Sequence, residues 1–160
     1  MKPRPPTLRQ KRRYILAEVI PHYRRIEPRQ MYIAAFEALS SLWGDAHTSE
    51  LQMAVISCEC GYCIFRCTRG SEAFVETALS TVTEVNGERV ALHPMATSGT
   101  LHALKTRMRP LPEEHTLEGV ELAGVMYSGI IFQRQKVDLY AKGIKNQETL
   151  YFTRDEMEVD

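Results

Sequence analysis

Residues 53–68 read MAVISCECGYCIFRCT, and the architecture follows from this stretch. It contains two short apolar runs, Met53 to Cys60 and Cys63 to Thr68, with Gly61 between them. Short apolar runs on either side of a glycine predict two strands joined by a tight turn. The neighbouring segments then indicate what pairs with this hairpin.

Upstream of the hairpin, the sequence predicts a strand and then a helix. In residues 13–20, two sets of side chains alternate along the chain, which is the pattern of a strand with two faces. The helix begins at Pro28, which suits a first helical position, and ends before Gly44, which suits the position after the last turn. Its predicted apolar stripe consists of Tyr32, Ala35, Phe36, Leu39, Leu42 and Trp43.

Downstream, the chain predicts a helix, a strand and a short helix. Ser71 is the expected N-cap of the first helix, with Glu72 in its first turn. After a turn at Asn86-Gly87, residues 89–96 form the next strand candidate, and Pro94 confines that strand to an edge or a bulge. The remaining expectations are inward-facing Phe74, Val75, Ala78, Leu79 and Val82, and a short helix from Leu101 to about Met108.

This order of elements predicts an α+β fold of the ferredoxin-like, RNA-recognition-like βαββαβ type. Such a fold is a four-stranded antiparallel sheet with helices on one face, here followed by a C-terminal helix and an extension. RNA-recognition domains stack bases on the open face with aromatic side chains of the third strand. Residues 63–67 carry no such aromatic pair, so we expect the last helix or another protein to cover that face.

Composition divides the chain into three segments. Residues 1–10 form a flexible basic arm, 11–110 the domain, and 111–160 an acidic extension with a hairpin between 137–141 and 149–153 and an acidic tail. The net charge is zero, yet residues 1–111 hold fifteen Lys/Arg against ten Asp/Glu, whereas 112–160 hold five against ten. No apolar run has the length of a membrane span or a secretion signal, so a cytoplasmic protein is expected.

Four cysteines lie close together and raise the question of zinc. Their spacing differs from two separated C-x₂₋₄-C pairs, and strand alternation allows all of them to point into the core. Core packing is therefore the favoured interpretation, zinc with His47 or His102 as a further ligand is the alternative, and disulfides are not expected. The cysteines are Cys58, Cys60, Cys63 and Cys67.

The sequence shows no pattern of catalytic residues. The histidines are scattered outside any nucleophile, metal or acid–base arrangement, and glycine-rich phosphate loops are absent. We therefore expect no catalytic residue and no metal site in this chain. The histidines are His22, His47, His93, His102 and His115.

Two segments carry groups that suit phosphate. Lys11-Arg12-Arg13 follows a basic arm and can neutralise phosphates, although such a run can also be a solvated surface. Ser98-Gly99-Thr100 precedes a helix that carries Lys105. A turn of this kind offers backbone N–H groups to an anion, and its alternative role is an ordinary N-cap.

Three segments together resemble a known family. Lys11-Arg12-Arg13-Tyr14, the run from Gly61 to Arg69 and the run from Thr97 to Lys105 occur in that order. They resemble archaeal ribonuclease P protein component 2, the family of the eukaryotic subunits called Pop-five and Rpp-fourteen. The resemblance covers about residues 9–109.

The resemblance implies a non-catalytic subunit of ribonuclease P. In that family the RNA and its magnesium ions remove the 5′ leader from precursor tRNA, and this chain binds no cofactor itself. The implied partners are ribonuclease P RNA, precursor tRNA indirectly, and protein component 3 (the Rpp-thirty relative) in a heterotetramer. The exposed face of the predicted sheet separately indicates a homodimer for the isolated chain. The alternative is a protein-interaction module that bridges subunits of another ribonucleoprotein.

Carried over residue by residue, the resemblance implies an RNA-binding set. Its members are Arg9, Lys11, Arg12, Arg13, Arg66, Arg69, Ser98, Gly99, Thr100 and Lys105. His102 and Thr106 stand where relatives often carry basic residues, which implies a weaker grip by the last helix. The acidic extension is expected to contact protein or to pack on itself, through its apolar runs near Val125 and Ile130.

Overall fold

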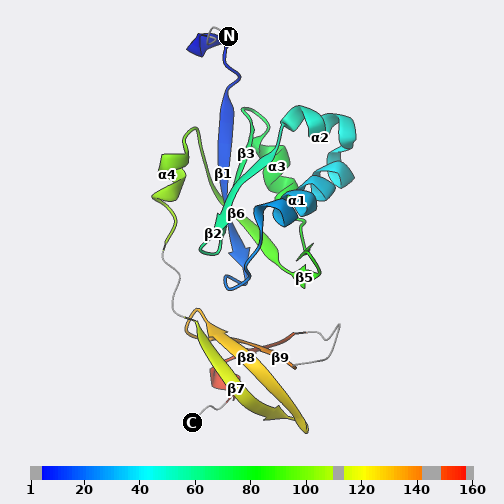
Figure 1. The fold of residues 1–160 in the computed structure, drawn as a ribbon, viewed down its shortest axis with the longest axis vertical. Helices are drawn as coiled ribbons and strands as arrows, with labels where there is room; N and C mark the ends of the chain where they lie inside the picture. Colours follow the sequence, from blue (N-terminus) through cyan, green and yellow to red (C-terminus); the bar gives the residue numbers. More distant parts are fainter. Residues whose placement is uncertain (1–4, 110–113, 142–148, 158–160) are drawn as a thin grey trace. The chain divides into compact units, whose positions relative to one another are not determined.

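The computed structural model describes residues 5–109, 114–141 and 149–157 and contains two compact units (Figure 1). The first unit is Met1–Arg109 and the second is Pro110–Asp160. Ahead of the first sheet, a single 3₁₀ turn, η1 (Pro6–Leu8), follows the start of the described chain. Within the described residues, no helix is long and apolar enough to cross a membrane.

The first unit is built on a four-stranded antiparallel sheet in the order β2-β3-β1-β6. Its strands are β1 (Arg12–Ile20), β2 (Ala54–Glu59), β3 (Tyr62–Thr68) and β6 (Ala91–Ser98). The predicted hairpin is confirmed, because β2 and β3 pair across a turn at Cys60 and Gly61, both with positive φ. The α+β class and the antiparallel sheet are also confirmed.

Helices cover both faces of this sheet to different extents. The longer helices α1 (Pro28–Trp43) and α3 (Glu72–Leu79) pack against the larger apolar cluster, which α2 (Asp45–Leu51) completes. Alternate residues of β1 point to opposite faces, so Ile15 joins this cluster and Leu16 joins a smaller one. In the smaller cluster, Leu104 of α4 (Leu101–Lys105) packs over Ile64. The last helix therefore covers part of the second face, as predicted.

The inward face of α1 differs from the predicted stripe. Met31, Ala35 and Leu39 are the buried residues of this helix, while Tyr32 and Phe36 are exposed and stack on each other. Leu42 is exposed as well. The buried set is spaced by four residues, and its small Ala35 side chain lets the helix backbone approach the sheet. The prediction is therefore right for Ala35, Leu39 and the partly buried Trp43, and wrong for the aromatic residues Tyr32 and Phe36 and for Leu42.

Three other local predictions can be compared with the structure. Helix α3 begins where expected, but the Ser71 side chain makes no cap hydrogen bond; instead the Glu72 carboxylate accepts from the Gly70 N–H at 2.6 Å. The Asn86-Gly87 turn is confirmed and joins β4 (Glu84–Val85) to β5 (Glu88–Arg89). β6 is an edge strand, and its register with β1 shifts at Pro94, as predicted. Helix α2 was not predicted, because only Thr48 and Leu51 of its polar sequence are buried.

The second unit is a four-stranded antiparallel sheet in the order β10-β9-β8-β7. Its elements are β7 (His115–Leu122), β8 (Val125–Phe132), β9 (Lys136–Tyr140), β10 (Leu150–Thr153) and the 3₁₀ turn η2 (Asp155–Met157). The predicted hairpin of the extension is confirmed by the pairing of β9 with β10, while its turn at 142–148 lies outside the described residues. Strands β7 and β8 were not predicted.

Gly129 allows the close packing at the centre of this second sheet. A Cβ atom at this position would lie 2.5 Å from Leu139 Cδ2 and 3.1 Å from the Asp138 carbonyl oxygen. Leu139 itself is fully buried, as is Val137 on the same strand. A methyl group here therefore forces the backbone or the core to move.

We expect Gly129→Ala to destabilise the second unit by about 1–3 kcal/mol, the usual cost of overpacking a core. Amide hydrogen exchange on the full chain should show reduced protection in β8 and β9 and unchanged protection in β1 and β3. Ser128→Ala, one residue away, is the control and should leave the protection of both units unaltered. Full protection of β8 in Gly129→Ala would contradict the packing described here.

Candidate nucleic-acid interface

Three segments that are distant in sequence meet at one end of the first sheet. Because β1 lies between β3 and β6, Tyr14 is opposite both Arg66 and Ser98. The Arg69 N–H donates to the Lys11 carbonyl at 3.0 Å, which joins the start of β1 to the residues after β3. We call this region the basic end of the sheet. It consists of Lys11, Arg12, Arg13, Arg66, Arg69 and the turn Ser98–Thr100.

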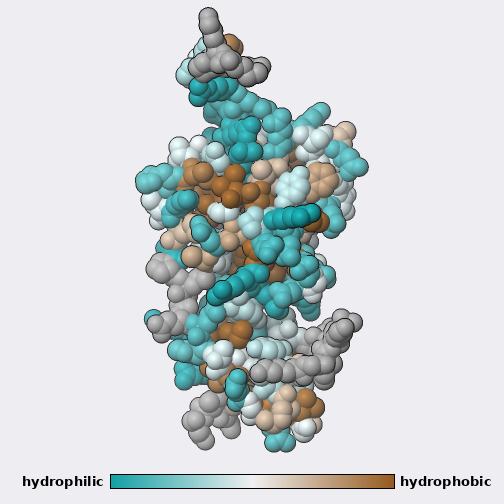
Figure 2. Space-filling view, in the orientation of Figure 1, coloured by the Kyte–Doolittle hydropathy of each residue, from teal (hydrophilic) through white to brown (hydrophobic). Residues whose placement is uncertain are grey.

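Strand alternation divides the basic end between two faces. Tyr14 and Ile64 belong to the cluster beneath α4, so Arg12 and Arg66 lie on that face. Arg13 lies on the opposite face with Ile15, toward α3. The Nε atom of Arg66 is buried and has no hydrogen-bond partner among the described residues. Figure 2 shows a hydrophilic surface around the start of β1.

Arg13 connects two neighbouring elements. Its Nε lies 3.3 Å from Oε1 of Glu72 in the first turn of α3. Its Nη1 lies beside the β6–α4 turn, at 3.7 Å from where a Cβ of Gly99 would be. The guanidinium therefore reaches from α3 to the turn that carries Ser98 and Thr100.

The Ser98–Thr100 turn has the geometry of an N-cap. The Thr100 hydroxyl accepts from the Ala103 N–H at 3.4 Å, and the Ser98 hydroxyl accepts from the Thr100 N–H at 3.2 Å. The N-cap role that the sequence left open is thus the one that the structure contains. Any RNA contact by this turn stays a prediction.

Two members of the predicted set lie away from the basic end. Lys105 is the last residue of α4, at the opposite end of that helix from Thr100. Arg9 precedes β1 in extended backbone just after η1. Glu72 contacts the basic end through its ion pair with Arg13, although the sequence predicted it only as an acid in the first turn of a helix. Its pairing with Arg13 joins residues 59 positions apart, and nothing in the local sequence signals it.

The cysteines correct two predictions. Cys58 and Cys63 face each other across the hairpin, with Cα atoms 4.2 Å apart, and form a disulfide that was not expected. Cys60 is exposed rather than in the core, because it occupies the turn with a φ of 53°. Cys67 is buried in the larger cluster, as predicted. The described residues contain no group of three or more His, Cys, Asp or Glu side chains that is placed to hold a metal ion.

The two alternative zinc ligands have other surroundings. The His47 ring packs edge-on against Phe74, with centroids 4.7 Å apart. His102 lies exposed on α4.

Burial, with smaller contributions from the carboxylates of Glu72 and Glu76, raises the pKa of the Cys67 thiol from 9.0 to about 12. Since the thiolate is the reactive form, Cys67 is inert at neutral pH.

These cysteine environments predict a stepwise alkylation pattern. At pH 8 the native protein should take up one iodoacetamide, at Cys60. Unfolding without reductant should add Cys67, and unfolding with reductant should add Cys58 and Cys63. Intact-mass and peptide mass spectrometry measure each step. Uptake at Cys67 in the folded protein, or of four labels without reductant, would contradict the assignment.

The first unit is an α+β domain with cationic side chains gathered at one end of its sheet. The sequence profile of the Rpp14/Pop5 family of ribonuclease P proteins matches residues 13–109. The chain belongs to this family.

Relatives extend the similarity over the second unit. The chain is 49% identical to ribonuclease P protein component 2 of Methanoculleus marisnigri and 46% identical to that of Methanosphaerula palustris, each over 99% of both chains. With the protein of the same name from Methanosarcina acetivorans it shares 36% identity over 60% of this chain and 72% of the relative. A chain in a cryo-EM structure of yeast ribonuclease MRP is similar at a TM-score of 0.48 and 11% identity, covering 57% of this chain and 76% of that one, which is too distant to bear on the fold.

Proposed function

We propose that this chain is a non-catalytic protein subunit of ribonuclease P that binds and activates the catalytic RNA for removal of the 5′ leader from precursor tRNA. The observation that carries the proposal is the 49% identity, over 99% of both chains, to a ribonuclease P protein component 2. The family profile over residues 13–109 supports it independently. The setting of this activity is the cytoplasm.

In this proposal the chemistry belongs to the RNA and to magnesium ions bound by the RNA. The protein acts through charge: side chains at the basic end offset the repulsion between backbone phosphates and release condensed counterions. Arg12 and Arg66 lie on one face of the sheet, and the β6 end that leads into the hydroxyl-bearing turn at 98–100 lies on the other side of β1 from Arg66. Such a role needs fixed cations rather than a nucleophile or a general base.

The first unit is proposed to have the ferredoxin-like, RNA-recognition-like arrangement, with residues 11–110 as the RNA-binding domain. The strand order β2-β3-β1-β6 supports this assignment. So does the chain order, in which β1 and β6 flank two helix-containing connections with the hairpin between them. The RNA-facing surface is then one sheet end, and α4 occupies part of the open face where RNA-recognition domains stack bases.

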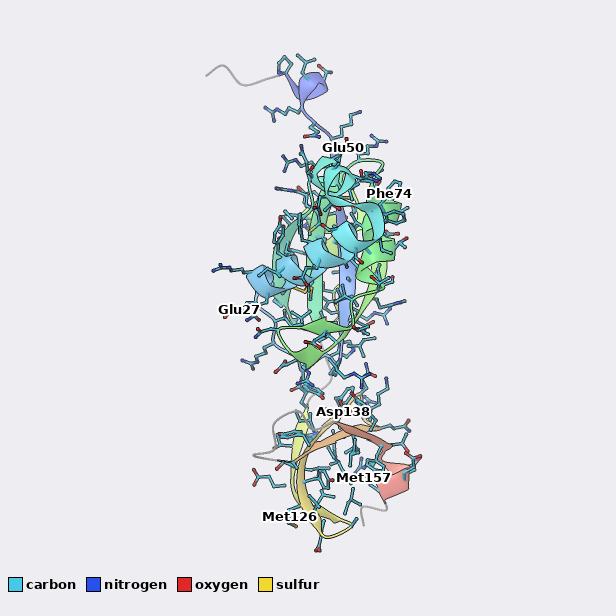
Figure 3. All side chains as sticks on the ribbon, turned by 90° about the vertical axis from the view of Figure 1, so that its right-hand side faces the viewer. Glu27, Glu50, Phe74, Met126, Asp138 and Met157 are labelled. Carbon is cyan, nitrogen blue, oxygen red and sulfur yellow. A yellow bond between two sulfur atoms is a disulfide. The ribbon has the colours of Figure 1, made fainter. Side chains whose placement is uncertain are left out.

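The second unit is proposed to contact protein rather than RNA. Residues 112–160 have twice as many acidic as basic side chains, which repels phosphate. At the start of β8, Val125 and Met126 are exposed apolar residues, and the label in Figure 3 marks Met126 at the tip of the β7–β8 hairpin. The partners proposed for the whole chain are protein component 3, in a heterotetramer, and a second copy of the chain when it is isolated.

Binding to ribonuclease P RNA transcribed from the same genome tests the proposed function. The full chain should bind this RNA more tightly than an unrelated structured RNA of equal length. The double variant Lys11→Ala, Arg12→Ala should bind more weakly. Its plot of log affinity against log salt should flatten by up to ~0.9 for each phosphate that the variant no longer neutralises.

A matched control removes two exposed cations elsewhere on the same unit, in the double variant Arg25→Ala, Arg89→Ala. This control should retain the wild-type salt slope. Equal slopes for all three proteins would exclude the basic end as the RNA interface. Equal affinity of the wild type for both RNAs would count against the ribonuclease P assignment itself.

A further inference from the structure

We propose that Glu72 is a positioning residue for RNA binding, holding the guanidinium of Arg13 against the β6–α4 turn. The inference rests on the proposed function, in which Arg13 contacts RNA. It adds an acidic residue to an interface otherwise composed of cations and hydroxyl groups. An acid beside a phosphate-binding surface weakens binding unless it performs such a task.

The contacts of Arg13 determine which of its atoms remain directed at the turn. The ion pair with Glu72 uses Nε, at 3.3 Å from Oε1. A guanidinium is planar and rigid, so fixing the Nε edge also fixes the direction of the two terminal nitrogens. Nη1 is accordingly found next to Gly99, at ordinary van der Waals distance from where a side chain there would begin. With Nε paired to Glu72, the two terminal nitrogens are the edge of the guanidinium left for a bidentate contact to phosphate.

Glu72 is itself held in place by the backbone. Its second carboxylate oxygen accepts from the Gly70 N–H at 2.6 Å, in the loop that follows β3. The side chains of Glu72 and Arg13 are 20% and 33% exposed, respectively, so solvent screens the pair only in part. The carboxylate thus joins the β3–α3 loop to Arg13, and Arg13 joins it to the β6–α4 turn.

The benefit to binding is preorganisation. A free arginine side chain loses rotamer freedom when it binds phosphate, and ordering one such side chain at an interface costs about 0.5–1.5 kcal/mol. Glu72 imposes that order before RNA arrives. Its removal should therefore weaken RNA binding by roughly two- to tenfold, although it also removes a negative charge from the interface. Charge repulsion alone predicts the opposite sign.

The test is a double-mutant cycle on the full chain, with affinity for ribonuclease P RNA measured across a salt series. Arg13→Ala should weaken binding and flatten the salt slope, because a phosphate contact is lost. Glu72→Ala should weaken binding and leave the slope unchanged, because Arg13 is still present to neutralise the phosphate and only its ordering is lost. The double variant should bind like Arg13→Ala alone, because Glu72 acts only through that residue. Glu72→Gln retains one oxygen that can accept from the Arg13 Nε–H, while its amide NH₂ replaces the oxygen that accepts from the Gly70 N–H, so it should restore part of the affinity.

Glu76→Ala is the matched control on the same helix. Its carboxylate accepts from the Thr97 hydroxyl at 2.7 Å rather than from Arg13. This variant removes the same charge one turn further along α3 and should bind RNA at least as tightly as the wild type. A second readout needs no substitution: the Arg13 Nε–H signal in ¹H–¹⁵N NMR should stay protected from exchange in both free and RNA-bound protein.

The possible outcomes separate the inference from the proposed function. Tighter binding by Glu72→Ala, additive effects in the double variant, or loss of Nε–H protection on RNA binding would each overturn the positioning role. Normal binding by Arg13→Ala, with weakened binding by the Lys11 and Arg12 double variant, would overturn it while leaving the proposed function intact. Equal wild-type affinity for ribonuclease P RNA and an unrelated RNA would contradict both.

Discussion

The central position of β1 in the first sheet is the constraint on which the rest of the structure depends. Because β1 pairs antiparallel with both β3 and β6, its first residues lie beside the last residues of both neighbours. The same strand contributes Ile15 to the larger apolar cluster and Leu16 to the smaller one, so both faces of the sheet are anchored through it. The packing that stabilises the unit therefore also brings together the strand ends, and the turn residues next to them, that form the basic end.

Local chemistry made much of this fold predictable, and long-range packing accounts for what was missed. Pro28, Gly44 and the Asn86-Gly87 turn act through their own backbone preferences, and the elements that they delimit are found where expected. The buried face of α1 depends on how closely a helix approaches the sheet, which small side chains decide. The members of the basic end could be predicted from the sequence, because they are basic or hydroxyl-bearing residues in recognisable segments. The pairing of Arg13 with Glu72 could not, because it depends on tertiary contact.

In the second unit, too, long-range packing explains why two strands were not predicted from the sequence. Strands β7 and β8 contain glycine at 119 and 129, with a third glycine at 124 in the turn between them, which weakens a strand pattern in sequence. In the structure Gly129 has a packing role beneath Leu139. The Cys58–Cys63 disulfide was not predicted either, because the expected compartment argued against it, whereas the hairpin register places the two residues opposite each other. The local sequence indicates what each residue can do, whereas its neighbours in space depend on the whole fold.

The two parts of the chain carry opposite net charges, which suggests that they have different partners. The positive balance lies with the unit that carries the basic end, and the negative balance lies with residues outside the family match.

The most direct measurement is to isolate the tagged chain from its own cells, sequence the RNA that it retains and identify the accompanying proteins. The account predicts enrichment of ribonuclease P RNA together with a second protein subunit. A retained protein partner without that RNA, unchanged by nuclease or salt, would contradict it.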